Sequence, residues 1–416
     1  MKILLSALAC EPEKGSEPEV GFRAMLAAAS RHDVWVLTLP ESVPAIERAL
    51  GEDGRASRIH LETIEFETGG KRLADLTASR FHLGYDRWQR EAAARALQLD
   101  RKIDLDIVHH VTLASYWTRA GVAVVDKPLV WGPIGGGVNP PPRLLAELGT
   151  RGMIEAGVRV LGRPVIARLP SSMRTQRVAA VILAQNPATG RRLKGTGKMK
   201  LLSNALAVEL NGTAHPEHRN ADLLFVGRLL PWKAPILALR ALRYVKHPEA
   251  VLRFFGDGPE QARVERAAQK WGLRDRILFE GWVPRRRLLS VLAGAGVLIH
   301  PALHEEAGLC IAEALTLGTP VVTLDHGGPS EIVGQWRGTP TALISPRSPE
   351  VTARSMATAI DRFLIDPPPV RQTPLPGGTS FEAELLRAYE TAAGAPRGGR
   401  TVSSRTPRRP RMLPRP

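Results

Sequence analysis

Four charged residues in the second half of the chain could bind a sugar joined to a diphosphate. Arg228 and Lys233 lie in the segment 223–242, LLFVGRLLPWKAPILALRAL, and follow an apolar run that predicts a strand. Two cations on one loop suit a diphosphate, because arginine binds phosphate as a fork and lysine as a point charge. Glu305 and Glu313 would repel phosphate and accept hydrogen bonds from sugar hydroxyls instead. Either pair taken alone is more simply explained as solvated surface charge.

The residues between the two glutamates predict a helix that begins at an anion-binding end. Gly308 precedes a helical pattern that runs from about Leu309 to Leu317. The first N–H groups of a helix have no partner within the helix, and its dipole is positive at this end. A nucleotide phosphate could bind there.

In the first half of the chain, a glycine-containing loop and a histidine pair could face the same ligand. Gly15 and Ser16 would let the backbone approach phosphates or an acceptor, although a glycine there could equally mark a turn. His109 and His110 are adjacent near the end of a predicted strand. Because side chains alternate along a strand, only one of the two can face a cleft.

Strands that end in loops recur along the chain and must position these residues. The predicted strands are 3–9, 33–40, 106–111, 128–132 and 178–185 in the first half, and 222–227, 251–256, 277–281, 296–301 and 320–325 in the second. Helical patterns, such as 19–30 and 87–97, lie between several of them. This alternation predicts an α/β protein with parallel sheets covered by helices on both faces. Ligands bind beyond the carboxyl ends of such strands, so two facing sheets would form a cleft between domains.

Length and composition fit an ordinary globular protein. At roughly 150 residues a domain, the 416 residues predict two large domains or three small ones, and 44% of them are hydrophobic. Two cysteines, Cys10 and Cys310, are too few for a disulfide framework or a multi-cysteine zinc site, which favours a reducing cytoplasm. No apolar run reaches the roughly 18 residues of a membrane span. The short N-terminal run 3–9 predicts a buried strand rather than a signal peptide.

The chain is strongly basic, with a formal net charge of +16. Such a charge makes nucleic acid, anionic lipid and phosphorylated substrates candidate partners. About half of the excess follows Glu390, in a tail whose composition cannot form a core, and no aromatic-rich nucleic-acid motif accompanies it. The segment 143–177 carries seven arginines against two glutamates, interleaved with apolar residues. It predicts either a stretch that lies on an anionic membrane or a solvated helix pair.

Order and spacing together resemble the retaining glycosyltransferase family 4, the group-1 transferases of GT-B fold. The family pattern is a strand, Gly-Arg, several residues and Lys, and later two glutamates separated by seven residues. It matches Gly227, Arg228, Lys233, Glu305 and Glu313. Further similar segments are 9–22, 106–117, 128–138, 251–260 with Gly256, and 277–284 with Gly281 and Trp282, the last of which looks like the part of the family near the nucleotide base.

The resemblance implies a GT-B enzyme, with two Rossmann-like domains whose parallel sheets face an interdomain cleft. Such an enzyme moves a sugar from a UDP- or GDP-linked donor to an acceptor with retention of configuration, and requires no metal or other cofactor. Arg228 and Lys233 would hold the donor diphosphate, where cations stabilise the charge of the leaving group. Glu305 would contact the donor sugar and Glu313 the ribose.

The same resemblance assigns secondary roles around the donor. Backbone N–H groups of Leu309 and Cys310 would add phosphate contacts, and a histidine at position 109 or 110 would be linked to the donor sugar. Three glycines at 135–137 resemble an acceptor-side loop, with a flexible turn as the alternative.

A polar interval at 203–220 separates the two halves of the chain. We expect an acceptor-side domain over 1–205, a nucleotide-sugar domain over 206–375, a helix over 376–394 that packs back on the first domain, and a disordered basic tail over 395–416. The expected acceptor is a glycan or a lipid-linked saccharide in cell-envelope or polysaccharide synthesis. The expected location is cytoplasmic, with peripheral attachment to the inner face of the membrane as a hypothesis, and no specific nucleic acid is expected.

Four positions depart from the family pattern. Glu19, Ala234 and Glu306 stand where the family usually has glycine, and Ala307 stands where it has an aromatic residue. Ala307 leaves less to pack against a donor sugar, so altered donor preference or reduced activity would follow. Two alternatives stay open: a GT-B-fold epimerase or phosphorylase, and a non-catalytic protein that binds nucleic acid or membrane through its basic surface.

Overall fold

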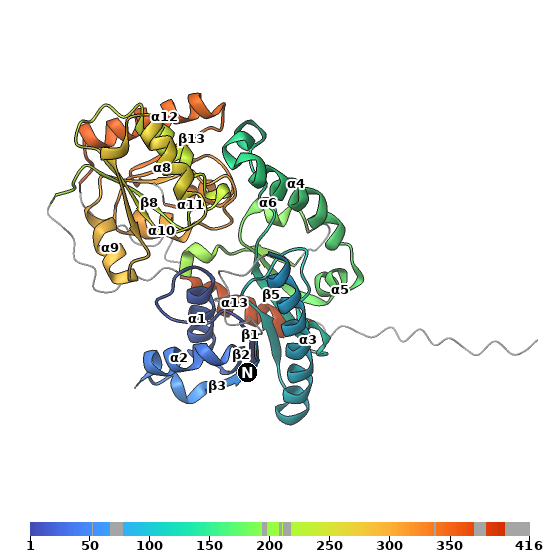
Figure 1. Cartoon of the computed structure of the whole chain (residues 1–416). Helices are drawn as coiled ribbons and strands as arrows, with labels where there is room; N and C mark the ends of the chain where they lie inside the picture. The colour runs from blue at the N-terminus through green and yellow to red at the C-terminus, as the bar shows by residue number, and fades with distance from the viewer. Residues whose placement is uncertain are drawn as a thin grey trace, which may run out of the picture.

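The strands of the chain form two separate parallel sheets (Figure 1). A computed structural model of the chain describes residues 1–51, 53–66, 78–193, 198–207, 210, 218–336, 338–369 and 380–395. Within these residues the first sheet has seven strands in the order β3-β2-β1-β4-β5-β6-β7, and the second has six in the order β10-β9-β8-β11-β12-β13. Every strand pair is parallel, which confirms the predicted α/β fold with two parallel-sheet domains.

The first domain alternates strands and helices. Its strands are β1 (Lys2–Ser6), β2 (Asp33–Thr38), β3 (Ile59–Thr63), β4 (Ile107–His110), β5 (Leu129–Ile134), β6 (Ala179–Ala184) and β7 (Met199–Leu201). Its helices are α1 (Ser16–Ala29), α2 (Val43–Leu50), α3 (Ala78–Ile103), α4 (Gly149–Ile166), α5 (Pro170–Val178) and α6 (Pro187–Gly190).

The second domain repeats this alternation. Its strands are β8 (Asp222–Val226), β9 (Val251–Phe255), β10 (Ile277–Gly281), β11 (Val297–His300), β12 (Val321–Leu324) and β13 (Thr341–Ile344). Its helices are α7 (Pro235–Leu242), α8 (Gln261–Lys270), α9 (Arg285–Gly294), α10 (Leu309–Thr316), α11 (Gly328–Gln335) and α12 (Pro349–Ile365). All ten strands predicted from the sequence are present. The three additional strands, β3, β7 and β13, lie at sheet edges.

Continuous apolar runs form the central strands because both faces of each sheet are covered by helices. In β1, Ile3 and Leu5 pack into a core with α1, whereas Leu4 points to the opposite face and packs into a core with α3. In β8, Leu223 and Leu224 divide in the same way between the two cores of the second domain. The carboxyl ends of the central strands are thereby held rigidly, and the loops that follow them carry the candidate site.

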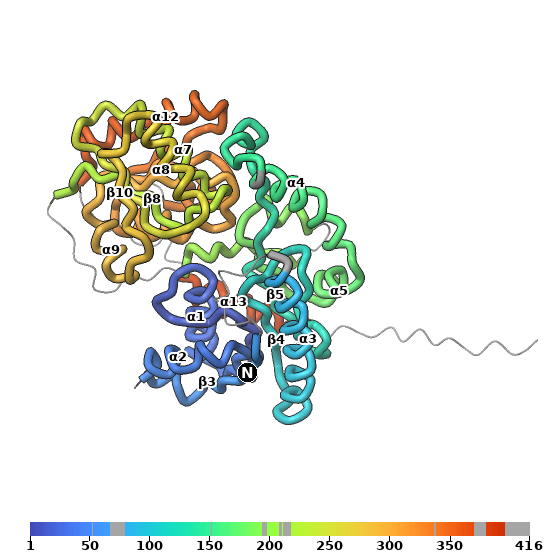
Figure 2. Tube along the Cα trace, viewed as in Figure 1, coloured from blue at the N-terminus to red at the C-terminus, as the bar shows by residue number. Residues whose placement is uncertain are grey.

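The last described helix of the chain packs on the first domain. Helix α13 (Phe381–Ala393) begins at Ser380, whose side chain accepts a hydrogen bond from Ala383 N at 3.1 Å. Phe381 and Tyr389 are buried in the same core as α1, and Figure 2 shows α13 beside α1 on the first domain. The predicted basic tail lies outside the described residues, apart from Ala395.

Candidate functional site

A cavity of about 470 Å³ lies between the two domains. Its wall in the second domain is formed by Trp232, Lys233, Leu309 and the run 304–307. The first domain contributes Ser16 and Glu17 at the start of α1, Phe81, His82 and Tyr85 from α3, residues 113–115, Trp117, Thr118, Gly135, Gly136, Gln185 and Asn204. Four residues predicted from the sequence therefore meet at one cavity: Ser16, Lys233, Glu305 and Leu309.

Lys233 and Glu305 form an ion pair on the cavity wall. Lys233 ends the 3-10 turn η7 (Pro231–Lys233) after β8, and its ammonium contacts Glu305 Oε2. His300 Nε2, at the end of β11, donates a hydrogen bond of 3.2 Å to the same oxygen. Burial disfavours the charged carboxylate, but Lys233 and His300 outweigh it and hold the pKa of Glu305 well below its usual range. The cavity wall thus carries a permanent pair of opposite charges.

Backbone geometry positions the loop of Glu305 and the turn of Lys233 relative to each other. Leu303 N donates to Trp232 O at 2.8 Å, so the loop that carries Glu305 is joined to the turn that carries Lys233. Ala234, which stands where the family has glycine, adopts a left-handed conformation with φ 50° and ψ 52°. This conformation costs a residue with a Cβ roughly 1–2 kcal/mol, which is the physical reason for a glycine at this position.

Arg228 lies on the same post-strand loop as Lys233. Its side chain is exposed and makes no hydrogen bond or ion pair with any part of the chain that the structure describes. The neighbouring glycines shape its loop: Gly256 has φ 126°, and a Cβ there would lie 2.4 Å from Gly227 O. Gly227 and Gly256 do not line the cavity, and they hold the backbone that presents Arg228.

Helix α10 is present where the sequence predicted a helix, and its first residue lies at the cavity. Gly308 caps it in a left-handed conformation with φ 76°, and Leu309 lines the cavity. Cys310 Sγ lies 3.4 Å from His300 Nδ1, and burial raises the pKa of the thiol to about 12. The thiol is therefore neutral at physiological pH and packs behind the Lys233–Glu305 pair.

Glu313, one turn into α10, pairs with Arg285 at the start of α9. Burial raises the pKa of the carboxyl, and Arg285 partly offsets this effect. The loop before α1 reaches the same place, because a Cβ on Gly15 would lie 3.6 Å from Arg285 Nη1. Gly15 and Ser16 both have left-handed backbones, with φ 63° and 51°. The predicted phosphate-side loop of the first domain and the predicted ribose contact of the second therefore approach each other.

Neither His109 nor His110 faces the cleft, so the expectation that one of them does is corrected by the structure. His109 Nε2 donates to Gly132 O at 2.6 Å, and its Nδ1 lies 2.8 Å from the Tyr389 hydroxyl of α13. His110 points to the other face, with Nε2 3.1 Å from the Tyr85 hydroxyl. Burial lowers the pKa values to about 4 and about 3. Alternation along β4 is as predicted, but both faces are covered, and Tyr85 stands between His110 and the cavity.

Gly281 and Trp282 lie at the end of β10, away from the cavity. Gly281 O accepts a hydrogen bond from Gly256 N at 2.7 Å, and Trp282 is 73% exposed. The hydrogen bond between Gly256 and Gly281 thus joins the loops that follow β9 and β10.

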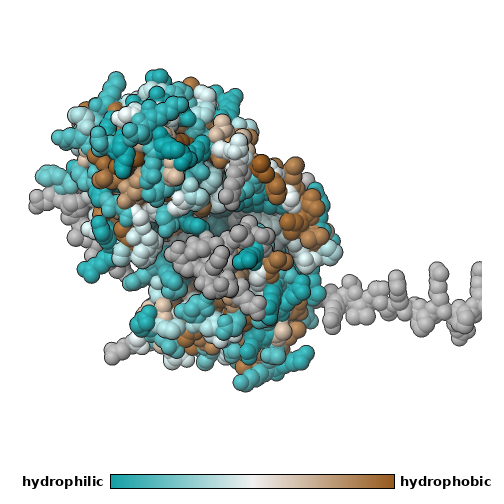
Figure 3. Space-filling model, in the orientation of Figure 1, coloured by the Kyte–Doolittle hydropathy of each residue, from teal (hydrophilic) through white to brown (hydrophobic). Residues whose placement is uncertain are grey.

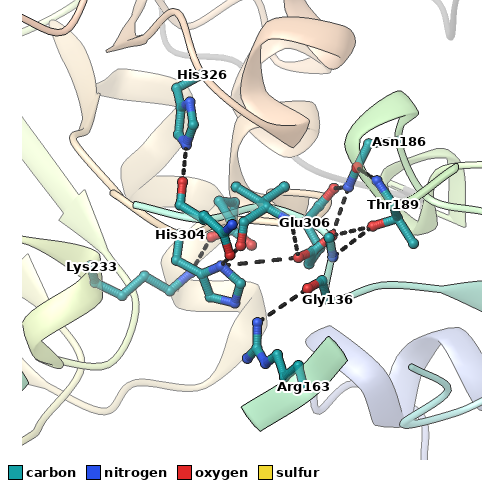
Figure 4. A network of polar contacts seen from close by, with 12 residues as sticks. Gly136, Arg163, Asn186, Thr189, Lys233, His304, Glu306 and His326 are labelled. Carbon is teal, nitrogen blue, oxygen red and sulfur yellow. Dashed lines mark hydrogen bonds and ion pairs between the residues drawn. The ribbon is translucent and has the colours of Figure 1, made fainter. Parts of the chain in front are cut away.

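Glu306 connects the two domains, a role that sequence reasoning missed (Figure 4). Its carboxylate accepts hydrogen bonds from Val138 N at 3.1 Å, from Asn186 Nδ2 at 2.8 Å and from Thr189 Oγ1 at 2.9 Å. His304 Nδ1 donates to Val138 O at 2.7 Å beside it. One signal of this role was present in the sequence, an acid where the family has glycine. The sequence could not identify the partners of Glu306, because they are far away along the chain.

Glu17 is a second cavity residue that was not predicted. Its carboxylate accepts hydrogen bonds from Leu113 N at 2.8 Å and from Asn204 Nδ2 at 3.3 Å. Burial raises its pKa, and the Leu113 N–H opposes the rise. Glu17 is thus the desolvated acid on the first-domain side, opposite the charged pair of the second domain.

Asp104, Leu105 and Asp106 have the letters of an Asp-x-Asp metal motif, but both acids have partners within the protein. Asp104 pairs with Lys127 at 2.5 Å, and Asp106 accepts a hydrogen bond from Lys2 N at 2.7 Å. Across the described ranges, no group of three or more His, Cys, Asp or Glu side chains is arranged to hold a metal ion.

Residues 213–373, which cover most of the second domain, match the family model described as "Glycosyl transferases group 1". The chain is 33% identical over 157 residues to the 2-deoxystreptamine glucosyltransferase of Streptomyces kanamyceticus, a match that spans 37% of this chain and 39% of that protein. It is 32% identical over 154 residues to the glycogen synthase of Mycobacterium tuberculosis, which spans 36% of each. The matches thus cover well under half the length of these relatives.

Solved structures resemble the chain over both domains. Sucrose-phosphate synthase of Thermosynechococcus elongatus has a TM-score of 0.58 at 16% identity, over 94% of this chain and 96% of that one. HepE of Anabaena, in complex with UDP, has a TM-score of 0.56 at 17% identity, over 94% of each chain. The described part of the chain has the two-domain fold of GT-B glycosyltransferase structures, and the sequence likeness to the group-1 family is concentrated in the second domain.

Proposed function

We propose that this protein is a glycosyltransferase that moves a sugar from a nucleotide diphosphate to an acceptor held by the first domain. The observation that carries the proposal is the Lys233–Glu305 pair on the wall of the interdomain cavity, with Arg228 as an exposed cation on the same post-strand loop. The family match over 213–373 supports it, because that range contains all three residues.

The chemistry at the donor follows from these charges. When the bond between sugar and diphosphate breaks, negative charge develops on the leaving phosphate oxygen, and fixed cations there stabilise the transition state. Arg228 and Lys233 fill this role. Glu305 remains ionised, and its second oxygen can accept a hydrogen bond from a hydroxyl of the donor sugar. We propose that the reaction needs no metal ion, because side-chain cations stabilise the leaving group. We propose retention of configuration from the resemblance to family 4.

The acceptor would bind in the first-domain half of the cavity. Trp117, Tyr85 and Phe81 offer flat apolar surfaces to a saccharide ring, and Glu17 offers a carboxylate to a hydroxyl. We infer a glycan or lipid-linked saccharide acceptor in cell-envelope or polysaccharide synthesis.

An apolar stripe on α4 supports peripheral attachment to an anionic membrane from the cytoplasmic side. Its members are spaced three or four residues apart and are strongly exposed: Ile154 at 69%, Val158 at 67%, Leu161 at 75% and Val165 at 64%. Figure 3 shows apolar side chains gathered over this part of the first domain. Exposed arginines at 168, 174 and 177 flank the stripe and complement anionic lipid. No helix in the described part of the chain could itself cross a membrane.

The donor assignment is tested by titrating UDP, GDP and ADP, each with matched sugar conjugates, into the full chain. UDP comes first, because the HepE structure contains it. Arg228→Ala should weaken binding of the preferred nucleotide about tenfold or more. Arg266→Ala, an exposed arginine of α8, is the control and should bind as the wild type does. Absence of saturable binding, or equal binding by both variants, would refute the proposal.

A further inference from the structure

Two arginines of α4, the rim arginines, lie on tryptophans that line the interdomain cavity. Arg159 and Arg163 lie one turn apart on α4, on the face opposite the exposed apolar stripe. The guanidinium of Arg159 lies 4.4 Å from the ring centroid of Trp232, and that of Arg163 lies 4.2 Å from the ring centroid of Trp117. Arg163 Nη1 also donates to Gly136 O at 3.1 Å. Within the described residues neither guanidinium lies within ion-pair distance of a carboxylate.

The nearest acids do not neutralise this pair. Glu155 lies one turn earlier on α4 and attracts Arg159 without a close contact. Glu306 attracts Arg163, but its carboxylate oxygens already accept three hydrogen bonds from the first domain (Figure 4). Burial and the neighbouring Arg159 lower the pKa of Arg163 to about 10. The rim therefore carries two partly desolvated positive charges that repel each other.

A third basic side chain faces them from another helix. His82 of α3 lines the cavity, and burial together with the charges of Arg159 and Arg163 lowers its pKa. The tryptophans beneath both guanidinium groups also line the cavity. His82 thus lines the cavity itself, and the two arginines lie on aromatic rings of its wall.

We propose that Arg159, Arg163 and His82 bind a phosphate group of the acceptor, so that the acceptor is a phosphorylated molecule whose reacting hydroxyl enters the cavity. This inference rests on the proposed transferase function and names the acceptor class. Two guanidinium forks match the geometry of phosphate oxygens. The two guanidinium charges also match the roughly −1.5 to −2 charge of a phosphate monoester at neutral pH, and His82 can add a hydrogen bond. The phosphate could belong to a free acceptor or to a lipid headgroup, and the test separates these sources.

The test measures binding of decyl phosphate, below its micellar concentration, to the full chain saturated with the nucleotide that it binds best. Saturation fills the donor site, so the probe reports the rim. Decyl β-glucoside is the neutral reference probe. Arg159→Gln/Arg163→Gln should weaken decyl phosphate about tenfold or more and leave the glucoside and the nucleotide unaffected. The control Arg168→Gln/Arg174→Gln changes two exposed arginines of the same region and should bind decyl phosphate as the wild type does.

His82→Ala gives an independent readout that leaves the packing of α4 intact. It should weaken decyl phosphate severalfold, and thermal unfolding of every variant establishes that it is folded. Equal binding of decyl phosphate by the rim variant and the wild type would overturn the proposal, as would an equal loss in the control pair.

Vesicles of phosphatidylcholine and phosphatidylglycerol distinguish the two sources of phosphate. The rim variant should still float with them, because the outward stripe and outward arginines remain. Loss of flotation without any binding of soluble decyl phosphate would assign the rim to lipid headgroups and overturn the acceptor assignment. Absence of nucleotide binding by the wild type would refute the transferase function instead. A titration with decyl phosphate in the absence of nucleotide would then still decide whether the rim arginines bind phosphate.

Discussion

Lys233 and Glu305 carry opposite charges on one wall of the cavity, so each stabilises the charged form of the other. Removing the lysine alone leaves a largely buried carboxylate without its partner, which is more costly than replacing both groups by neutral ones. The pair therefore has two separable contributions, one to folding and one to the transition state.

Lys233→Met should lower the free energy of unfolding by about 2–4 kcal/mol and lower turnover by about 10²–10³. Lys233→Met/Glu305→Gln should recover most of the stability and none of the turnover, because the neutral pair packs without a buried charge. Denaturant unfolding and steady-state transfer rates measure the two effects. The control is Lys270→Met, an exposed lysine of α8. A double variant that regains turnover would remove Lys233 from the catalytic site.

Glu17 gives a pH dependence of stability with a defined sign. Its pKa is raised in the folded chain, whereas the unfolded chain titrates near the ordinary value of about 4.3. Between these values the folded state holds a proton that the unfolded state has lost, so wild-type stability falls as pH rises through this window. Glu17→Gln should therefore unfold at the wild-type temperature near pH 4 and become relatively more stable toward neutral pH. Glu41→Gln changes an exposed acid and should show no such trend. If the unfolding temperatures of Glu17→Gln and the wild type differed by the same amount at every pH, the raised pKa of Glu17 would be contradicted.

The sequence predicted residues that share a local motif and missed those whose partners are distant in the chain. Lys233, Glu305 and Leu309 could be placed because a strand, a glycine and a helix start fix each of them locally. Glu306 could not, because its hydrogen-bond donors come from loops more than a hundred residues away. The histidine pair shows the same limit: alternation in β4 gives opposite faces, but only tertiary packing places Tyr389 over one and Tyr85 over the other.

At the scale of elements, the loop after β11 joins the domains as well as forming the cavity wall. Glu306 accepts three hydrogen bonds from residues around β5 and β6, and hydrogen bonds to charged groups are stronger than neutral ones. His326 Nε2 adds a bond of 2.7 Å to Asn139 O (Figure 4). The residue that stands where the family has glycine thus joins the two domains beside the cavity.

Glu306→Ala should loosen this contact without unfolding either domain. Hydrogen exchange of the Val138 amide should become about tenfold faster or more, since it loses its charged acceptor. Substrate affinity should fall more than turnover, because the cavity must close again around the ligands. Glu249→Ala, an exposed acid of the second domain, is the matched control. Unchanged exchange at Val138 would refute the role of Glu306 as a connection between domains.

Central strands were predictable as elements, whereas three of the four edge strands in the described residues, β3, β7 and β13, were not. β1 and β8 are buried on both faces and therefore read as largely continuous apolar runs. β3 and β7 lie at sheet edges with intermediate or exposed side chains, so their sequences lack that signal. The missed strands change neither the sheet order around the cavity nor the position of any site residue.

For the molecule as a whole, the cavity opens between two domains while the apolar stripe of α4 faces outward on the first. Membrane attachment through the stripe would place the acceptor side of the cavity near the lipid surface and leave the second domain free to move. Burying a large apolar side chain contributes roughly 1.5–3 kcal/mol, and nearby arginines add an electrostatic term that salt weakens. Two stripe residues are therefore enough to control attachment.

Leu161→Ser/Val165→Ser should abolish flotation of the full chain with phosphatidylglycerol-containing vesicles, and raised salt should weaken flotation of the wild type. The control is Ile365→Ser, which removes an equally exposed apolar side chain from the second domain and should float as the wild type does. Equal flotation of the wild type with neutral and anionic vesicles would remove the membrane assignment. A wild-type dimer that the double variant dissociates would assign the stripe to a second copy of the chain, because one apolar face cannot be covered by both partners at once.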